Sequence, residues 1–368
     1  MKVLHLLNEG ELSWQKTFAN FVSGLSKLGI ENIIAMPNVG YTYDFLTNYK
    51  IGLAEKPAFN IIPIRFKGFF DPFSYFKLIN IIKSNKIDIV HSQLSRAAFY
   101  AGMSKKHTNV KVVSSAQKVS SIKYFLNSDV VVACSKSVED DLVKKGLSGR
   151  ICQIYNGINF DDYFVKRIEK DQAKARLGIS SETLCIGIVA RLSAMKGHKL
   201  LFESFKKIKE DFKDRAISLV VVGDGELLAE LKSLARNLEI EGDVIFLGRR
   251  DDLVELLCSF DLYVSSSIEK EGLPTILIEA LLMEVPVIAT DIAGTREIII
   301  NNKTGFLVNP DSESIYSSTK EFFVRFYNKD ESIIKIVENG KKHVIENFSL
   351  DKMVNEYFDI YKSLLNRS

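Results

Sequence analysis

The amino-acid sequence predicts an α/β protein made of two Rossmann-like domains, each with a doubly wound parallel sheet, that face a central cleft. Three observations predict this class. The chain has 368 residues, whereas one domain usually takes about 100–200. Short apolar runs alternate with longer amphipathic stretches, which is the pattern of successive β-α units. The alternation starts afresh after about Phe160, so each half is expected to supply its own sheet.

The first half contains apolar runs with the length and composition of buried strands. These runs are residues 3–7, 32–36, 87–90, 110–114 and 130–133. Helical patterns lie between them, including residues 14–28 and 72–83. Asp71 is a predicted N-cap of the second helix, because its carboxylate can accept a hydrogen bond from the first turn. Pro72 then occupies the first helical position, where a proline costs no hydrogen bond.

The second half repeats the pattern with a further set of apolar runs. These runs are residues 185–190, 217–222, 244–247, 262–265 and 285–289. The charged stretch 161–171 has little apolar periodicity, so we expect it to link the two domains. Residues 311–367 predict successive helices with no strand. Open α/β sheets bind ligands beyond the carboxyl ends of their strands, so the expected site is the cleft between the domains.

The composition gives no sign of nucleic-acid binding or of a membrane span. Lys and Arg total 49 against 46 Asp and Glu, and a net charge of +3 is too small to indicate a nucleic-acid partner. The first apolar run is too short for a signal peptide, and no run approaches the roughly 18–20 apolar residues that cross a bilayer. The four cysteines form no Cys-x-x-Cys motif, so we expect reduced thiols in a cytoplasmic protein.

The first motif that carries chemistry follows the predicted strand 185–190. Arg191 comes directly after the strand. Lys196 and Gly197 precede a predicted helix over residues 198–209. The positive end of a helix dipole disfavours a lysine there unless an anion shares the site, and helix amides with two cations would hold a diphosphate. The alternative is a solvated lysine and an arginine paired with an acid.

Glu279 lies on a predicted helix that is apolar on almost every side. Its neighbours are Ile276, Leu277, Ile278, Ala280, Leu281, Leu282 and Met283. Such a helix is buried, and a buried carboxylate is costly unless it is hydrogen-bonded. A vicinal diol, such as the ribose of a nucleotide, is a suitable partner. The alternative is a structural ion pair.

The loop before this helix reads Glu271-Gly272-Leu273-Pro274-Thr275. Pro274 suits the first turn of the helix, which places Glu271 in the loop. Gly272 permits close approach of the backbone to a ligand. The amides of Gly272, Leu273 and Thr275 open the helix and are candidate contacts for sugar or phosphate oxygens. The alternative for Glu271 is an exposed loop carboxylate, because the two preceding residues are also charged.

A third motif, Gly223-Asp224-Gly225-Glu226, follows the predicted strand 217–222 and precedes a helix. It is similar to a dinucleotide-binding fingerprint but lacks the third glycine. A tight strand-to-helix turn therefore explains it better than a NAD site does.

In their order and spacing, these motifs together resemble the C-terminal donor domain of the family 4 glycosyltransferases, which have the GT-B fold. The resemblance covers about residues 151–310. It rests on Arg191 with Lys196, on the motif 223–226, and on Glu271 with Glu279. Further phrases that agree are residues 155–159 (Tyr-Asn-Gly-Ile-Asn), 246–248 (Phe-Leu-Gly) and 304–308 (Thr-Gly-Phe-Leu-Val).

The resemblance implies a retaining transfer of a sugar from a nucleotide diphosphate sugar, without a metal cofactor. It implies that Arg191 and Lys196 bind the donor diphosphate and stabilise it as it leaves, and that Glu271 contacts the transferred sugar. These three residues are the expected catalytic set. Two cations at a diphosphate can do the electrostatic work of Mg²⁺, and no Asp-x-Asp motif follows a strand in this sequence.

The resemblance also implies which residues bind the donor. Glu279 binds the ribose hydroxyls, and the backbone near Gly248 and Arg249 borders the nucleobase. Gly10 lies in the loop after the first strand and is expected to bring the backbone to the diphosphate, although this loop has one glycine where the family usually has Gly-Gly. The remaining expected donor contacts are Gly272, Leu273, Pro274 and Thr275.

On the acceptor side the chain departs from the family pattern. Many relatives have a histidine after the strand that corresponds to residues 110–114, whereas residues 114–117 here are Ser-Ser-Ala-Gln. His91, which ends the predicted strand 87–90, is therefore the acceptor-side candidate. The alternative is a core or surface histidine.

Residues 65–77 interleave aromatic and basic side chains. Such a segment can dock on an anionic membrane and reach a lipid-linked acceptor. The alternative is that its aromatics pack into the first domain. Relatives often build lipopolysaccharide, capsule or other surface glycans, so we expect a cytoplasmic protein that works at the inner face of the cell membrane.

The sequence thus predicts an acceptor-binding domain over residues 1–160 and a donor domain over 161–348. Residues 349–368 are expected to form a helix that packs back on the first domain. The expected reaction is sugar transfer to a glycan or glycolipid. Two alternatives stay open: a non-catalytic subunit that binds a nucleotide sugar, and a nucleotide-sugar epimerase on the same fold.

Overall fold

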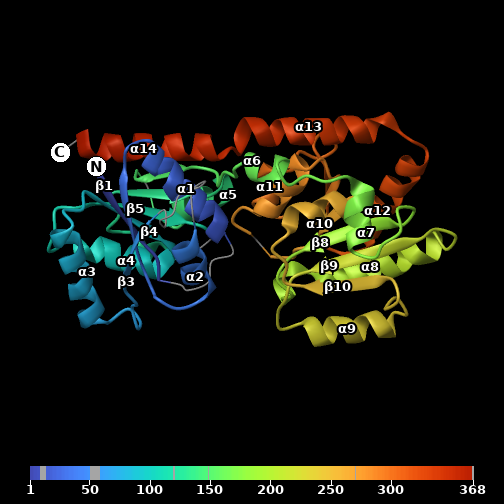
Figure 1. The fold of residues 1–368 in the computed structure, drawn as a ribbon, viewed down its shortest axis with the longest axis horizontal. Coiled ribbons are helices and arrows are strands. Elements are labelled where there is room, and N and C mark those ends of the chain that lie inside the picture. Colours follow the sequence, from blue (N-terminus) through green and yellow to red (C-terminus); the bar gives the residue numbers. More distant parts are fainter. Residues whose placement is uncertain (9–13, 50–58, 119–120, 148, 270, 367–368) are drawn as a thin grey trace. The chain divides into compact units, whose positions relative to one another are not determined.

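The computed structural model describes residues 1–8, 14–49, 59–118, 121–147, 149–269 and 271–366. The chain divides into two units, which we call unit 1 and unit 2 (Figure 1). Unit 1 comprises Met1–Asn159 and Phe348–Ser368, and unit 2 comprises Phe160–Asn347. Each unit contains one parallel sheet flanked by helices, so the predicted α/β class with two Rossmann-like domains is confirmed.

The sheet of unit 1 has the strand order β3-β2-β1-β4-β5-β6-β7, and every neighbouring pair is parallel. Its strands are β1 (Lys2–Leu6), β2 (Glu31–Met36), β3 (Asn60–Pro63), β4 (Ile89–Gln93), β5 (Lys111–Ala116), β6 (Val130–Ala133) and β7 (Ile151–Gln153). The order reverses between β1 and β4. This reversal leaves a crevice beyond the carboxyl ends of those two strands, which is where open α/β sheets bind ligands.

The helices of unit 1 are α1 (Gln15–Lys27), α2 (Tyr41–Asn48), α3 (Pro72–Ser84), α4 (Leu94–Ser104), α5 (Lys136–Lys144) and α14 (Leu350–Asn366), with the short 3₁₀ helix η1 (Ile122–Tyr124). Two of these helices, α3 and α5, start at a residue whose side chain caps the first turn. The predicted cap of α3 is confirmed, because Asp71 accepts a hydrogen bond of 3.0 Å from the Ser74 amide. Ser135 caps α5 in the same way through the Val138 amide.

The C-terminal helix α14 is part of the hydrophobic core of unit 1. Its residues Val354, Tyr357 and Tyr361 are buried with side chains of α1 and of the sheet. Phe21 of α1 lies with its ring centroid 4.8 Å from that of Tyr357. The last residues of the chain therefore complete a core that the first residues begin.

The sheet of unit 2 has the parallel order β10-β9-β8-β11-β12-β13. Its strands are β8 (Leu184–Val189), β9 (Ile217–Val222), β10 (Val244–Gly248), β11 (Leu262–Ser265), β12 (Val287–Thr290) and β13 (Phe306–Val308). Here the order reverses between β8 and β11. The loops that follow these two strands carry the motifs that the sequence analysis singled out.

The helices of unit 2 include two in the stretch that the sequence predicted to be a linker. They are α6 (Asp161–Phe164), α7 (Lys170–Arg176), α8 (His198–Asp211), α9 (Leu228–Asn237), α10 (Leu253–Ser259), α11 (Thr275–Leu282), α12 (Ser312–Tyr327) and α13 (Glu331–Asn347). The prediction for residues 161–171 was wrong because the stretch belongs to unit 2, where Tyr163 is buried and α6 and the start of α7 form. The predicted series of helices at the end of the chain is confirmed.

A buried ion pair fastens α7 to the sheet of unit 2. The Nζ of Lys174 lies 2.8 Å from Oδ2 of Asp261, and the two side chains are 3% and 5% exposed. Lys174 also donates to the carbonyl oxygen of Thr183, and Asp261 accepts from the Cys185 amide. Each buried charge thus has an opposite charge and further hydrogen bonds, which a buried ion pair requires.

We expect Lys174→Ala to lower the free energy of unfolding by about 3 kcal/mol, because it leaves the Asp261 carboxylate buried without its closest cation. The matched control is Lys170→Ala, since Lys170 binds the same carboxylate but is 46% exposed. An exposed pair contributes about 1 kcal/mol or less. Urea unfolding followed by circular dichroism would measure both variants. Equal losses in the two variants would contradict the account.

Candidate active site

Two loops of unit 2 are joined at the reversal point of its sheet: the loop after β8, residues 190–197, and the loop after β11, residues 266–274. The hydroxyl of Ser266 donates to the carbonyl oxygen of Lys196 at 2.9 Å, and the Ile268 amide donates to the carbonyl oxygen of Met195 at 2.8 Å. Gly197 has φ +63°, and a Cβ at this position would lie 1.9 Å from the carbonyl oxygen of Ser266. Only glycine therefore permits this contact.

The joined loops bring Lys196 and Glu271 together. The Nζ of Lys196 lies 2.6 Å from Oε2 of Glu271, and the side chains are 21% and 12% exposed. The hydroxyl of Ser267 donates to the other carboxylate oxygen. Both residues line a small cavity at the carboxyl ends of β8 and β11, together with Pro274 and the serines of residues 265–267. A partly buried cation and carboxylate therefore share the crevice where such sheets bind ligands.

Lys196 immediately precedes Gly197, the N-cap of α8. Burial and the nearby charge of Lys196 lower the pKa of His198, the first residue of α8, to about 4. His198 is consequently neutral near pH 7. The positive charge at this end of α8 comes from Lys196 and from the helix dipole, and both favour an anionic ligand.

Arg191 stands at the start of the same loop but points to a different partner. Its side chain is 76% exposed, and its Nε lies 3.7 Å from Oε2 of Glu226. The Leu192 amide donates to the carbonyl oxygen of Asp224, and a Cβ on Gly223 would lie 2.0 Å from the carbonyl oxygen of Ala190. The motif 223–226 thus supports the loop that carries Arg191. So weak an ion pair leaves Arg191 available to a ligand.

Glu279 projects from α11, whose other side chains are mostly buried. Its Oε1 accepts a hydrogen bond of 2.6 Å from the hydroxyl of Tyr163, which is 6% exposed. Sequence reasoning missed Tyr163, because the two residues lie 116 positions apart. The structure therefore gives this carboxylate a phenol as one of its partners.

The loop before α11 differs by one residue from its prediction. The helix starts at Thr275, and Pro274 is its N-cap with φ −75° and ψ 90°. Among the residues that the structure describes, none accepts a hydrogen bond from the amides of Gly272, Leu273 or Thr275. Gly272 and Leu273 are buried. These amides keep the capacity to bind anionic or sugar oxygens that the sequence analysis expected.

The remaining expected donor contacts are Gly248, Arg249 and Gly10. Gly248 ends β10 with φ +66° and accepts a hydrogen bond from the Gly223 amide, and Arg249 follows it as an exposed residue. Gly10 lies outside the described residues. Since β9 lies between β8 and β10, the segment at Gly248 is two strands away from Lys196.

His91 cannot contact an acceptor, which corrects its assignment. It is 0% exposed, and all its contacts lie within unit 1. Its Nε2 lies 2.7 Å from the Ser115 hydroxyl, and its Nδ1 lies 2.6 Å from the hydroxyl of Tyr361 on α14. Burial and the neighbouring His5 hold the pKa of His91 well below the usual range. His91 is therefore a neutral core residue that binds α14 to the sheet.

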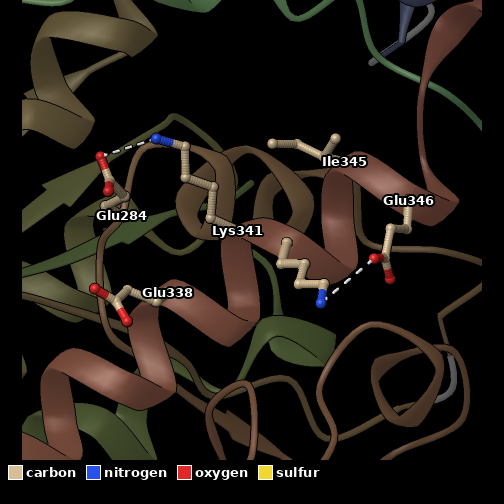
Figure 2. Close-up of a pocket in the computed structure, with 6 residues that line it drawn as sticks. Glu284, Glu338, Lys341, Ile345 and Glu346 are labelled. Atoms are coloured by element: carbon tan, nitrogen blue, oxygen red, sulfur yellow. Dashed lines mark ion pairs between the residues drawn. The ribbon is translucent and has the colours of Figure 1, made fainter.

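A larger surface hollow, of about 330 Å³, lies on α13 (Figure 2). Its walls are Glu284, Glu338, Lys341, Lys342, Ile345 and Glu346. Its charges already form ion pairs, Lys341 with Glu284 at 3.3 Å and Lys342 with Glu346 at 4.0 Å. None of its residues was predicted to bind donor or acceptor. We therefore interpret this hollow as part of a charged helix surface and not as a ligand site.

The described residues contain neither a candidate metal site nor a candidate membrane-spanning helix. No cluster of three or more His, Cys, Asp or Glu side chains in that part of the chain is arranged to hold a metal ion. None of the helices there has the length and apolar character that crossing a membrane requires.

Two family models match the chain, one on each half. The model described as Glycosyl transferases group 1 matches residues 169–343, and the model described as Glycosyltransferase Family 4 matches residues 15–162. The first model contains both joined loops and α11. The match on the first half shows that the family relationship extends beyond the donor domain on which the resemblance rested.

Individual relatives agree with the family models. The chain is 30% identical over 265 residues to N-acetyl-alpha-D-glucosaminyl L-malate synthase of Bacillus anthracis, which covers 70% of this chain and 66% of that protein. It is 24% identical over 381 residues to UDP-Gal:alpha-D-GlcNAc-diphosphoundecaprenol alpha-1,3-galactosyltransferase of Escherichia coli, which covers 92% of this chain and 94% of that protein.

The fold comparison spans the whole chain. The crystal structure of a glycosyltransferase from Rickettsia africae ESF-5 superposes with a TM-score of 0.87 at 26% sequence identity, over 100% of this chain and 99% of that one. Together with the two family models, this similarity shows that the chain belongs to the family 4 glycosyltransferases and has their GT-B fold.

Proposed function

We propose that this protein transfers a sugar from a nucleotide diphosphate sugar to a hydroxyl of a glycan or glycolipid, with retention of the anomeric configuration. The observation that carries the proposal is the meeting of Lys196 and Glu271 at the reversal point of the unit 2 sheet, beside the start of α8. The name of the E. coli relative gives a UDP-sugar donor and an acceptor linked to diphosphoundecaprenol. The proposed product is a bacterial surface polysaccharide or lipopolysaccharide.

In this proposal the donor diphosphate binds Lys196, Arg191 and the amides at the start of α8. Without donor, Lys196 is paired with Glu271. An arriving diphosphate competes for the same ammonium group, and this releases the Glu271 carboxylate to accept hydrogen bonds from sugar hydroxyls. Glu279 binds the ribose, and the backbone at Gly248 and Arg249 borders the base.

The proposed reaction is a front-side attack. The acceptor hydroxyl approaches on the face from which the diphosphate departs, and the departing phosphate oxygen takes its proton. Negative charge grows on the diphosphate as the glycosidic bond to it breaks, so Arg191 and Lys196 interact more strongly with the transition state than with the bound donor. Because these fixed cations supply the electrostatic stabilisation, we include metal independence in the proposal.

The acceptor side of the proposal includes contact with a membrane through residues 65–77. Phe70, Phe73 and Phe76 are 96%, 89% and 56% exposed, so these aromatics do not pack into unit 1. Hydrogen bonds from the Ser74 and Lys67 amides lower the pKa of Asp71, whose carboxylate is thereby occupied at the start of α3. Exposed rings with apolar faces favour the boundary between lipid headgroups and acyl chains.

The charge around these rings suits an anionic membrane. Residues 59–127 contain 11 Lys and Arg but only two Asp and Glu, although the whole chain carries a net charge of +3. Next to the exposed rings, Arg96 lies over the ring of Phe69, which stacks on Tyr124 of η1. Each basic residue near an anionic lipid surface contributes about 1 kcal/mol. We therefore assign the protein to the inner face of the cell membrane.

Lys196→Ala should lower kcat by about 10²–10³-fold, because it removes a cation that stabilises the leaving diphosphate. Arg191→Ala should act in the same direction. The matched control is Lys199→Ala, since Lys199 lies in the first turn of α8, just after the loop that carries Lys196, and is exposed in a pair with Glu230. Initial rates of nucleotide release would test this. Unchanged turnover in the Lys196 variant would remove Lys196 from the mechanism.

A thermal-shift panel of UDP-, GDP- and ADP-sugars tests donor binding. At a hundredfold excess over Kd, the cognate donor should stabilise the protein by about 2.7 kcal/mol, which raises Tm by about 5–10 °C for a unit of this size. Glu279→Ala should reduce the shift, and EDTA should change neither the shift nor the turnover.

Product analysis after incubation with the same donors, with and without acceptor, together with the thermal shifts, separates the competing functions. Conversion of the donor to its epimer without acceptor would favour an epimerase. Binding without transfer to any acceptor would favour the non-catalytic subunit. The absence of a shift with every donor would contradict the proposal for the unit 2 site.

The double variant Phe70→Ser/Phe73→Ser should float at least tenfold less with vesicles of phosphatidylglycerol and phosphatidylcholine than the wild type does. A matched control is Val165→Ser, because Val165 is an 84% exposed apolar residue of unit 2. The circular dichroism spectrum and Tm should stay the same in both. If the double variant floats as well as the wild type, the segment does not dock on membranes.

A further inference from the structure

Tyr163 lies three residues after the start of unit 2 in the sequence and contacts a residue of the candidate site, Glu279. It lies in α6, which begins one residue after Phe160, the first residue of unit 2. Its side chain is 6% exposed, and its hydroxyl donates to Oε1 of Glu279 at 2.6 Å. A short helix that opens unit 2 thus reaches the carboxylate proposed to bind the ribose.

The same segment is fastened to α11 at a second point. Arg167 forms an ion pair with Glu284, which follows the end of α11. Lys341 of α13 pairs with the same carboxylate at 3.3 Å (Figure 2). The Nζ of Lys341 also lies 5.7 Å from the centre of the Phe164 ring. The segment 160–167 is therefore held at the middle and at the end of α11, which limits how far Tyr163 can move from Glu279.

Tyr163 can donate this hydrogen bond to Glu279 throughout the working pH range. Burial and the adjacent Glu279 raise the pKa of Tyr163 far above its usual range, so the phenol keeps its proton at any working pH. An ionised carboxylate has about four acceptor positions on two oxygens, so the bond from Tyr163 does not by itself exclude a diol on the same group. A hydrogen bond to a charged partner is also stronger than a neutral one.

We propose that Tyr163 is a positioning residue, which holds the Glu279 carboxylate in the orientation that binds the two ribose hydroxyls of the donor. The inference rests on the proposed function. A free glutamate loses rotamer freedom when it binds a diol, whereas a carboxylate already oriented by Tyr163 does not. Tyr163 therefore sets the preference of the site for ribonucleotides over 2′-deoxyribonucleotides.

The test compares Tyr163→Phe with the wild type. The probes are UDP, GDP and ADP and their 2′-deoxy counterparts, with Kd measured by calorimetry for the base that binds. The variant should bind the ribonucleotide about tenfold more weakly, as expected for the loss of a hydrogen bond to a charged group, and the 2′-deoxynucleotide as the wild type does. The ratio of the two Kd values is measured on one preparation, so it does not depend on the folded fraction.

Two further variants complete the design. Tyr361→Phe is the matched control, because it removes a buried tyrosine hydroxyl that binds His91 in unit 1. For this control, the ratio of the Kd values for the 2′-deoxynucleotide and the ribonucleotide should equal that of the wild type. Glu279→Gln should abolish the ribonucleotide preference, and adding Tyr163→Phe to it should have no further effect.

The outcomes separate the two levels of the proposal. If Glu279→Gln abolishes the preference but Tyr163→Phe keeps it, the positioning role is overturned and the ribose assignment stands. Tighter ribonucleotide binding by Tyr163→Phe would also overturn the role, because the phenol would then compete with the ribose. If Glu279→Gln keeps the full preference, the ribose assignment itself fails, and the role of Tyr163 fails with it.

Discussion

The contact between the β8–α8 loop and the β11–α11 loop is the constraint on which the donor side of this protein depends. The strand order of unit 2 reverses between β8 and β11, so two loops leave the sheet side by side in opposite directions. Gly197 lets their backbones touch, and Lys196 and Glu271 meet as a result. The strand order thus brings the two loops together, and the loops then bring the side chains of Lys196 and Glu271 together.

Unit 1 has the same topological reversal but uses it differently. His5 of β1 and His91 of β4 are partners in register across the reversal, and both are buried. Burial lowers the pKa of His5 to about 4, despite its hydrogen bond to Asn32. Both histidines are thus neutral near pH 7, and His91 shares a hydrogen bond with the hydroxyl of Tyr361 of α14. In unit 1, a side chain of the strand pair at the reversal thus holds the last helix to the sheet.

The sequence was sufficient to predict the central strands and the main site loops, because each of these features is local. A buried strand shows as an apolar run, and Lys196 and Glu271 are marked by the glycine next to each. The missed strands, β3, β7 and β13, have three or four residues and lie at sheet edges. Edge strands are half-covered and need no continuous apolar run, so local periodicity does not reveal them.

Contacts distant in sequence could not be predicted in the same way. Tyr163 and Glu279, and likewise Lys174 and Asp261, each looked like an ordinary residue of a charged or apolar stretch until the fold placed them together. The prediction for His91 was wrong because the strand is longer than the apolar run indicated. The residue ends a predicted strand, but β4 continues to Gln93, and this leaves His91 inside the strand with its side chain toward α14.

The division of the chain has a consequence for the order in which the protein is made. Unit 2 is continuous, from Phe160 to Asn347, whereas unit 1 needs Phe348–Ser368 to complete its core. During synthesis all of unit 2 leaves the ribosome before α14 does, and domains fold as units as they emerge. Unit 1, whose first part is translated before unit 2, therefore completes its core only after unit 2 has been made, and until α14 is made the side chains of α1 lack its packing.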